Sequence, residues 1–333
     1  MPFEIPAFLV RWFARPYVAG SSLEAGLLVA ERLLESGVRT TLDLLAEGVR
    51  TEARVQENIR VYEQMIDGVA ARFADAETRP TISLKPSSYT LDPLDAREGA
   101  TANGSREAIA HLAEHAHERG VALTLDMEDR RWTDFTIDLA NEMFARGYDF
   151  GTVLQARLHR TEHDLARIPP GMRVRMVIGI YREPAELALT EKPAMKQRLL
   201  AQAAALLQRG VHVELATHDE QCIERFLREV VPQSGVGCDR FEIQMLYGVP
   251  RARLIERILD GKLFRDGGRA PVVRLYVPFA TSWDQATAYC RRRLKANPSI
   301  GVYVARNLLG SLVGKPPGSM PRKRDQRALS GVT

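Results

Sequence analysis

Three side chains near the end of the chain have the spacing of a binding site for a small anion. Tyr289, Arg292 and Arg293 stand three and four residues apart, so on a helix they share one face, while Arg291 points elsewhere. Two neighbouring guanidinium groups repel each other, but their rigid forks suit a small carboxylate that is gripped from two sides. A solvated basic surface is the simpler interpretation of such a run, and the choice depends on the residues upstream.

Polar residues recur upstream, at the ends of short β-rich runs. The set combines charged, amide and aromatic side chains: Asp43, Glu47, Lys85, Asp126, Glu128, Gln155, Arg157, Arg175, Tyr181, Thr217, His218, Gln244, Tyr247 and Tyr276. Each of them has an ordinary structural alternative, such as capping the next helix or satisfying a loop carbonyl. Together they would be costly to bury without a ligand, so the set predicts a polar site where the runs end.

The elements that must position these residues alternate regularly between strand and helix. Eight β-rich runs are expected, over residues 38–42, 81–85, 121–126, 151–155, 173–180, 211–216, 241–246 and 272–277. Helical patterns follow them, over residues 52–73, 105–118, 133–146, 193–209, 220–231 and 251–260, and an earlier one covers 22–36.

Eight strand–helix units predict an α/β fold of the (β/α)8 barrel type, in which the C-terminal ends of the strands carry the chemistry. The arginine helix follows the eighth run at once, which places it over the barrel mouth as the last helix. An open doubly wound sheet is the alternative, but no G-x-G-x-x-G motif follows any of the runs.

Composition excludes several classes of protein. The 333 residues are 45% hydrophobic and 26% charged, and a net charge of +4 is too small to indicate a nucleic-acid partner. Three widely spaced cysteines indicate neither a disulfide framework nor a zinc site and fit a reducing cytoplasm. No signal peptide or membrane-length apolar run is evident. We expect an N-terminal helical segment over 1–37, the barrel over 38–299, and over 300–333 a helix with a basic tail whose composition is typical of disorder.

Seven segments, in the same order along the chain, resemble the proline dehydrogenase family. They are residues 82–85 (ISLK), 125–129 (LDMED), 175–184 (RMVIGIYREP), 216–219 (ATHD), 241–248 (FEIQMLYG), 276–278 (YVP) and 289–294 (YCRRRL). The closing Tyr-x-x-Arg-Arg element is specific when it follows a Gln-Met-Leu-Tyr-Gly strand. The resemblance covers about residues 38 to 300 and implies a monofunctional bacterial flavoenzyme on a distorted barrel.

The resemblance implies an activity and a role for each site residue. The enzyme would bind FAD, oxidise L-proline to Δ1-pyrroline-5-carboxylate by hydride transfer from proline C5 to flavin N5, and pass the electrons to a membrane quinone. By this likeness the substrate residues are Lys85, Arg292 and Arg293 for the carboxylate, with Tyr276, Tyr181, Met176 and Tyr289 around the ring. The flavin residues are Arg175, Gln155, Gln244, Thr217 and His218, with Asp126 under the site and Asp43 and Glu47 behind it.

Charge and burial agree with those roles and add a requirement. Cations around one carboxylate fix the orientation of the substrate, so the protein catalyses by positioning and the redox chemistry belongs to the cofactor. A buried Lys85 without a partner would lose its charge, so we predict that a carboxylate from Asp43, Glu47 or Asp126 lies beside it.

The sequence departs from the family pattern at four positions. Ala296 stands where the arginine helix usually carries Glu, Ile178 where Lys is usual, Ile180 where a small Ala is usual, and Arg157 where an aromatic residue is common. Ile180 is expected to crowd the barrel mouth. The departures leave open a flavin-binding homologue with another cyclic amino acid as substrate, or with reduced activity.

Three further expectations concern specificity, membrane contact and metals. Tyr276 is expected to obstruct the hydroxyl of 4-hydroxyproline and so to favour L-proline. The first helical pattern, over 6–13, mixes apolar residues with arginine, which suits either peripheral membrane contact or a cover for the barrel. His159, Glu162 and His163 match the H-x-x-E-H zinc motif, but Pro169 and Pro170 follow at once, so no metal site is predicted there. The oligomeric state is left open.

Overall fold

The computed structural model describes residues 17–46, 48–181 and 183–282, which form a closed barrel of parallel strands. The strands lie in sequence order around the barrel, and β8 pairs with β1 to close it. Their bounds are β1 (Arg39–Leu44), β2 (Thr81–Leu84), β3 (Leu123–Leu125), β4 (Phe150–Gln155), β5 (Arg173–Val177), β6 (His212–Ala216), β7 (Phe241–Leu246) and β8 (Val272–Phe279). The predicted (β/α)8 fold is confirmed.

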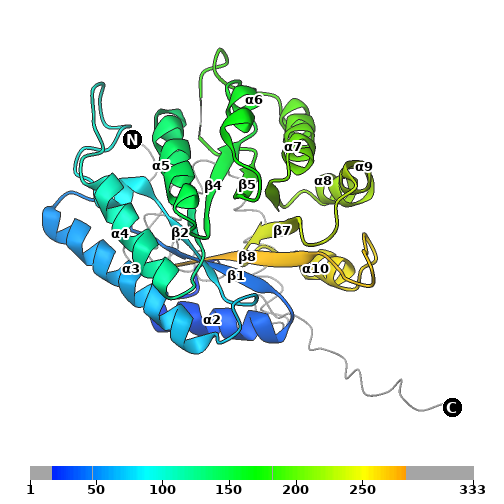
Figure 1. Ribbon diagram of the computed structural model, residues 1–333, viewed down its shortest axis with the longest axis horizontal. Coiled ribbons are helices and arrows are strands. Elements are labelled where there is room, and N and C mark those ends of the chain that lie inside the picture. The colour runs from blue at the N-terminus through cyan, green and yellow to red at the C-terminus, as the bar shows by residue number, and fades with distance from the viewer. Residues whose placement is uncertain (1–16, 47, 182, 283–333) are drawn as a thin grey trace, which may run out of the picture.

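Helices surround this barrel (Figure 1). They are α2 (Leu23–Glu35), α3 (Glu52–Arg72), α4 (Ser105–Glu118), α5 (Thr133–Ala145), α6 (Thr161–Asp164), α7 (Lys192–Gln208), α8 (Glu220–Arg225), α9 (Val231–Ser234) and α10 (Ala252–Leu259). Side-chain caps at Ser22 and Thr51 start α2 and α3, where each hydroxyl accepts a backbone N–H. None of these described helices combines the length and the apolar composition that a membrane-spanning segment needs.

α2 packs on the seam between β8 and β1, where a regular barrel would carry the helix that follows its last strand. Gly26 permits this close approach because it has no side chain: a Cβ at this position would lie 3.2 Å from the Phe279 ring. The seam between β8 and β1 is therefore covered by a helix that precedes the first strand. The arginine helix, the first helical pattern and the basic tail lie outside the described residues.

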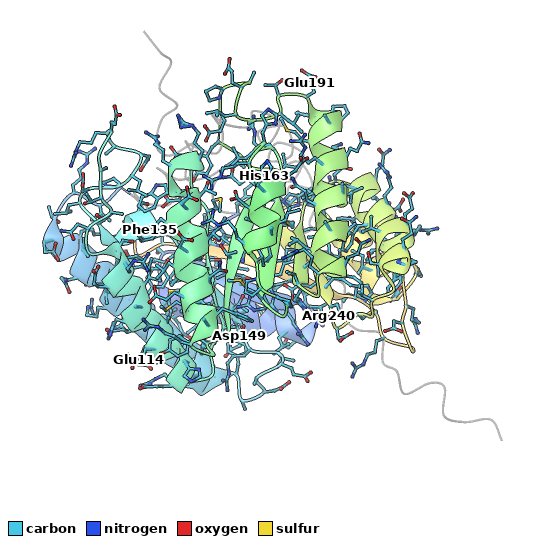
Figure 2. All side chains as sticks on the ribbon, turned by 45° about the horizontal axis from the view of Figure 1, so that its top comes forward. Glu114, Phe135, Asp149, His163, Glu191 and Arg240 are labelled. Carbon is cyan, nitrogen blue, oxygen red and sulfur yellow. The ribbon has the colours of Figure 1, made fainter. Side chains whose placement is uncertain are left out.

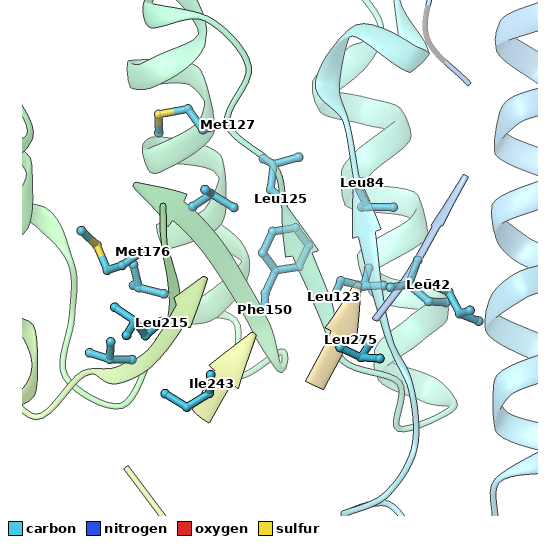
Figure 3. Close-up of a cluster of buried hydrophobic side chains, with 14 of the residues drawn as sticks. Leu42, Leu84, Leu123, Leu125, Met127, Phe150, Met176, Leu215, Ile243 and Leu275 are labelled. Atoms are coloured by element: carbon cyan, nitrogen blue, oxygen red, sulfur yellow. The ribbon is translucent and has the colours of Figure 1, made fainter. Parts of the chain in front are cut away.

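The strands turn apolar side chains outward and polar side chains inward. Leu42, Leu84, Met176, Leu215 and Ile243 belong to the hydrophobic layer between strands and helices (Figure 3). Alternate residues must therefore face the barrel axis. Those residues bond across the barrel, as Arg175 of β5 does to Ser83 of β2. Barrels of this type usually fill the axis with Val, Ile and Leu, so a charged interior is a distinctive feature of this chain.

Two predicted elements end or change earlier than expected. The fifth strand stops at Val177 and not at residue 180, because Gly179 has a φ of +101°, which no extended strand accommodates. The predicted helix over 220–231 widens into a π-helical turn at Phe226–Val230 before α9. Pro232 lacks the N–H that an α-helix needs at that point, which accounts for the change.

The two ends of the barrel are readily told apart. Asp149 and Arg240, which precede β4 and β7, lie at one end, whereas Glu191, which ends the β5–α7 loop, lies at the other (Figure 2). The end where the strands finish, marked by Glu191, is the mouth of the barrel. The end where they begin, marked by Asp149 and Arg240, is the bottom.

Candidate active site

Lys85, the residue after β2, is a buried cation at the mouth. It is 9% exposed and forms an ion pair with Asp43 of β1. Its Nζ also lies 3.2 Å from the Tyr276 hydroxyl and 3.6 Å from the Asp126 carboxylate. Burial alone would lower the pKa of Lys85, but Asp43, assisted by Tyr276 and Asp126, raises it well above its ordinary value. The predicted carboxylate partner is confirmed, and Lys85 stays charged.

Asp126, the residue after β3, joins two more of the predicted site residues. Its Oδ1 accepts a 2.6 Å hydrogen bond from Arg175 Nη1, and its Oδ2 accepts a 2.7 Å bond from the Tyr276 hydroxyl. The Arg175 guanidinium carbon lies 5.1 Å from the Tyr276 ring centroid, within cation–π range. Burial, with the charges of Asp126 and Asp43, raises the pKa of Tyr276 well above its ordinary value, so the phenol is a neutral donor.

Gln244 of β7 holds Arg175 from below. Its Oε1 accepts from Arg175 Nε at 2.6 Å, and its Nε2 donates to Glu214 at 2.7 Å and to Glu242 at 2.6 Å. Only one amide orientation fits, because the flipped amide would set its oxygen against two carboxylates. Both amide hydrogens are thus used inside the barrel, and Gln244 fixes the rotation of the Arg175 guanidinium.

Below Gln244, two arginines pair with these carboxylates. Arg274 donates to Glu242 at 2.7 and 3.0 Å, and Arg173 donates to Glu214 at 2.8 Å. Burial would raise the pKa of Glu242, but Arg274 lowers it well below its ordinary value. Charges therefore alternate from the bottom of the barrel to the mouth.

Gln155, the last residue of β4, and Arg157, two residues beyond it, form the next part of the rim. Gln155 Nε2 donates to the Glu128 carbonyl at 2.8 Å, and the Glu128 carboxylate in turn accepts from the backbone N–H of Ser87 at 2.9 Å and from its hydroxyl at 2.7 Å. Arg157 donates from Nη1 to the Tyr181 carbonyl at 2.6 Å. These bonds link the loops after β2, β3, β4 and β5 around the mouth.

Thr217 and His218 follow β6 on the far part of the rim. The Thr217 hydroxyl accepts from the Asp219 N–H at 3.2 Å, and Asp219 Oδ1 accepts the Cys222 N–H at 2.9 Å as the N-cap of α8. His218 Nε2 accepts from the Leu246 N–H at 3.3 Å, which fixes the ring beside β7. Tyr247 comes directly after β7 and is partly buried, at the same end of the barrel.

Several predicted site residues are not brought to this cluster by the described structure. Met176 is fully buried in the hydrophobic layer, on the outward face of β5 opposite Arg175, so its predicted place beside the substrate ring is not supported (Figure 3). Ile180 is 55% exposed, which does not support the expected crowding. Glu47, Tyr289, Arg292, Arg293 and Ala296 lie outside the described residues.

Sequence reasoning missed the layer below the mouth. Ser83, Glu214, Glu242, Arg173 and Arg274 were not predicted, because only strand ends were considered. The signal was present in the sequence, since Arg173 and Arg175, and Glu242 and Gln244, alternate with apolar residues inside β-rich runs. Polar residues at every second strand position indicate a polar barrel interior.

One atom of this network bears on whether the site suits a bound cofactor. Arg175 Nη2 is buried and has no hydrogen-bond partner among residues 17–46, 48–181 and 183–282, although Arg175 Nε and Nη1 are bonded. A buried donor of this kind requires an acceptor. A polar heterocycle at the mouth would supply one, so the residues present fit a flavin. In the same described part, no cluster of three His, Cys, Asp or Glu side chains has metal-binding geometry.

Sequence comparisons relate this chain to known proteins. The family model described as proline dehydrogenase matches residues 27–175. A proline dehydrogenase of Deinococcus radiodurans is 33% identical over 301 residues, covering 89% of this chain and 90% of the relative. Proline dehydrogenase 1 of Bacillus subtilis subsp. natto is 29% identical over 309 residues, covering 91% and 93%.

A solved structure supports the same fold. The crystal structure of proline utilization A from Bdellovibrio bacteriovorus, inactivated by N-propargylglycine, superposes with a TM-score of 0.73 at 20% identity. It covers 94% of this chain, which spans only 36% of that longer protein. Because the Deinococcus radiodurans relative is 33% identical and the match covers most of both chains, this chain belongs to the proline dehydrogenase family.

Proposed function

We propose that this protein is an FAD-dependent proline dehydrogenase that converts L-proline to Δ1-pyrroline-5-carboxylate. The observation that carries the proposal is the meeting of Lys85, Asp126, Arg175 and Tyr276 at the mouth of a barrel from this family. Two cations, one neutral phenol and a carboxylate between them suit a small zwitterion better than an apolar or polymeric ligand.

The substrate carboxylate would bind to Lys85 together with Arg292 and Arg293. Lys85 keeps its charge through Asp43, so it is ready to pair with an anion without a change of protonation. Tyr276 would form a wall of the ring pocket, and its hydroxyl is held by Asp126 at 2.7 Å. Because this ring cannot easily retreat, a hydroxyl added to the substrate ring would meet it, and we propose a preference for L-proline over 4-hydroxyproline.

The cofactor would be held by Arg175, Gln155, Thr217 and His218. Bound FAD would supply the hydride acceptor, with its N5 receiving hydrogen from proline C5. Arg175 would offer Nη2 to the flavin, since that donor is buried and has no other partner in the described residues. Gln244 would act through Arg175, because its amide hydrogens are already bonded to Glu214 and Glu242.

Asp126 would hold Arg175 and Tyr276 in place beside the cofactor and the substrate. Its two oxygens are bonded to Arg175 and Tyr276, which fixes a flavin ligand and a substrate wall relative to each other. Positioning of this kind accounts for large rate effects when two reactants must meet in one geometry.

The electrons would pass to a quinone, which implies a cytoplasmic enzyme with peripheral contact at the membrane. We propose the segment 38–299 as the part that holds FAD and substrate. The alternative function, a flavin-binding homologue with another substrate or reduced activity, keeps the same site and differs in its response to proline.

An anaerobic spectrum of the purified protein tests the proposal. We expect flavin absorbance that L-proline bleaches and that 4-hydroxyproline bleaches more slowly. Flavin that proline leaves oxidised would favour the alternative, and protein that does not take up FAD would contradict both. Lys85→Met should abolish bleaching at moderate proline concentrations, whereas Lys262→Met, which removes a lysine with 64% side-chain exposure, is the matched control and should not.

A further inference from the structure

Arg157 is bonded to both ends of the segment between β5 and α7. Its Nη1 donates to the Tyr181 carbonyl at 2.6 Å, and its Nη2 donates to the Leu189 carbonyl at 3.3 Å. Its backbone N–H donates to the Ile178 carbonyl at 3.1 Å, and its backbone carbonyl accepts from the Leu189 N–H at 2.8 Å. Arg157 alone is therefore bonded near both ends of the segment from Ile178 to Leu189.

This segment passes close to the side chains at the end of β4. Gly179 sits so close that a Cβ there would lie 2.6 Å from Gln155 Oε1 and 3.0 Å from Arg157 Cδ. Its φ of +101° also requires glycine. Gly179 therefore packs against both Gln155 and Arg157, and a shift of the segment away from β4 would break these two contacts.

Residues beyond Tyr181 have other supports, and the Tyr181 carbonyl itself is bound by Arg157. The His159 N–H donates to the Leu187 carbonyl at 2.9 Å, and Glu183 Oε1 accepts from the Arg130 N–H at 3.1 Å. The bond from Arg157 to the Tyr181 carbonyl is short and charge-assisted, which makes it one of the stronger single contacts of the segment. It fixes the peptide unit from which the Tyr181 side chain projects.

We propose that Arg157 is a positioning residue that sets where the Tyr181 ring stands, and thereby the fit of the substrate ring. This rests on the proposed function and on the expectation from the family resemblance that Tyr181 lies against that ring. The guanidinium would act through its hydrogen bonds to the segment and not by direct contact with substrate. An aromatic residue at position 157 could not make these two bonds, so the arginine would give this chain its own way of placing Tyr181.

A double-mutant cycle tests the proposal. Arg157→Met keeps the aliphatic stem and removes both side-chain bonds, and Tyr181→Ala removes the ring. We expect Arg157→Met to raise the proline KM by about tenfold, the value of one charge-assisted hydrogen bond, and Tyr181→Ala to raise it at least as far. Each should change kcat by less than about threefold. The double variant should be no worse than the poorer single variant, because both changes remove the same placement of the ring.

Arg79→Met is the matched structural control. Arg79 is also partly buried and bonds backbone carbonyls, at 2.8 Å to Phe73 and 2.9 Å to Arg119, but at the bottom of the barrel. It should lower stability without changing the proline KM. If Arg157→Met and Tyr181→Ala multiply in their effects on KM, or if Arg157→Met leaves KM unchanged, the proposal is wrong.

Hydrogen exchange separates failure of this proposal from failure of the proposed function. In Arg157→Met, the amides of residues 178–181, 183 and 185–189 should exchange about tenfold faster than in the unmodified chain, and in Arg79→Met they should not. Unchanged exchange would overturn the positioning role whatever the protein oxidises. A protein that shows the faster exchange but is not reduced by proline would keep the positioning of Tyr181 and refute the proposed substrate.

Discussion

Replacing Asp43 by Asn isolates the charge that keeps Lys85 protonated. Asp43 is fully buried and pairs with Lys85, which is 9% exposed. After the change, Lys85 would keep the Tyr276 hydroxyl at 3.2 Å and the more distant Asp126 carboxylate at 3.6 Å. Breaking a buried pair costs about 3 to 5 kcal/mol, and because Asp126 remains we expect the lower end, about 3 kcal/mol at pH 7.

The pH dependence gives the second part of this prediction. The native pKa of Lys85 is raised, so its contribution to stability is full below its ordinary value of 10.5 and is lost as the pH rises through the native pKa. Without Asp43, burial lowers the pKa of Lys85, so charge, stability and proline affinity should decline at a lower pH than in the unmodified chain.

Urea unfolding and the proline KM, both followed from pH 6 to pH 10, measure these effects. Asp67→Asn is the control, because Asp67 forms exposed pairs with Arg119 and His115 and should cost less than about 0.5 kcal/mol. If Asp43→Asn shows the same KM–pH profile as the unmodified chain, another group keeps Lys85 charged and the reasoning fails.

Three further changes test other parts of the structure. Arg274 lowers the pKa of Glu242, so the stabilisation from this pair is present above the ordinary pKa of 4.5 and is lost as the pH falls. Between pH 5 and pH 3 the free energy of unfolding should fall by about 2 kcal/mol in the unmodified chain and not in Glu242→Gln. Gly179→Ala should cost at least about 2 kcal/mol in urea unfolding and reduce bound FAD, since its φ is +101° and its Cβ would meet Gln155. Gln202→Met should raise the melting temperature through about 1 kcal/mol of stabilisation, because the buried Gln202 amide has no hydrogen-bond partner in the part of the chain described; unchanged melting would point to a bound water.

The order of elements could be predicted from sequence because it rests on local patterns. β7 and α4 were predicted to the residue, since Phe241–Leu246 and Ser105–Glu118 are bounded by clear turn signals. The errors fall where one backbone position decides the outcome. Gly179 ended β5 early, and Pro232 widened a helix into a π turn.

The fold class, the family and the polar residues of the mouth that the structure describes could be predicted from sequence, because the type of a residue and its place after a strand are local properties. It also indicated that Lys85 needs a carboxylate, but it left Asp43, Glu47 and Asp126 as alternatives. Only the closed barrel decided that Asp43 is the direct partner and that Met176 faces away from the site. Closure brings β1 beside both β2 and β8 and gives each residue one of two faces, so partners from distant parts of the chain meet at distances that no spacing along the sequence specifies.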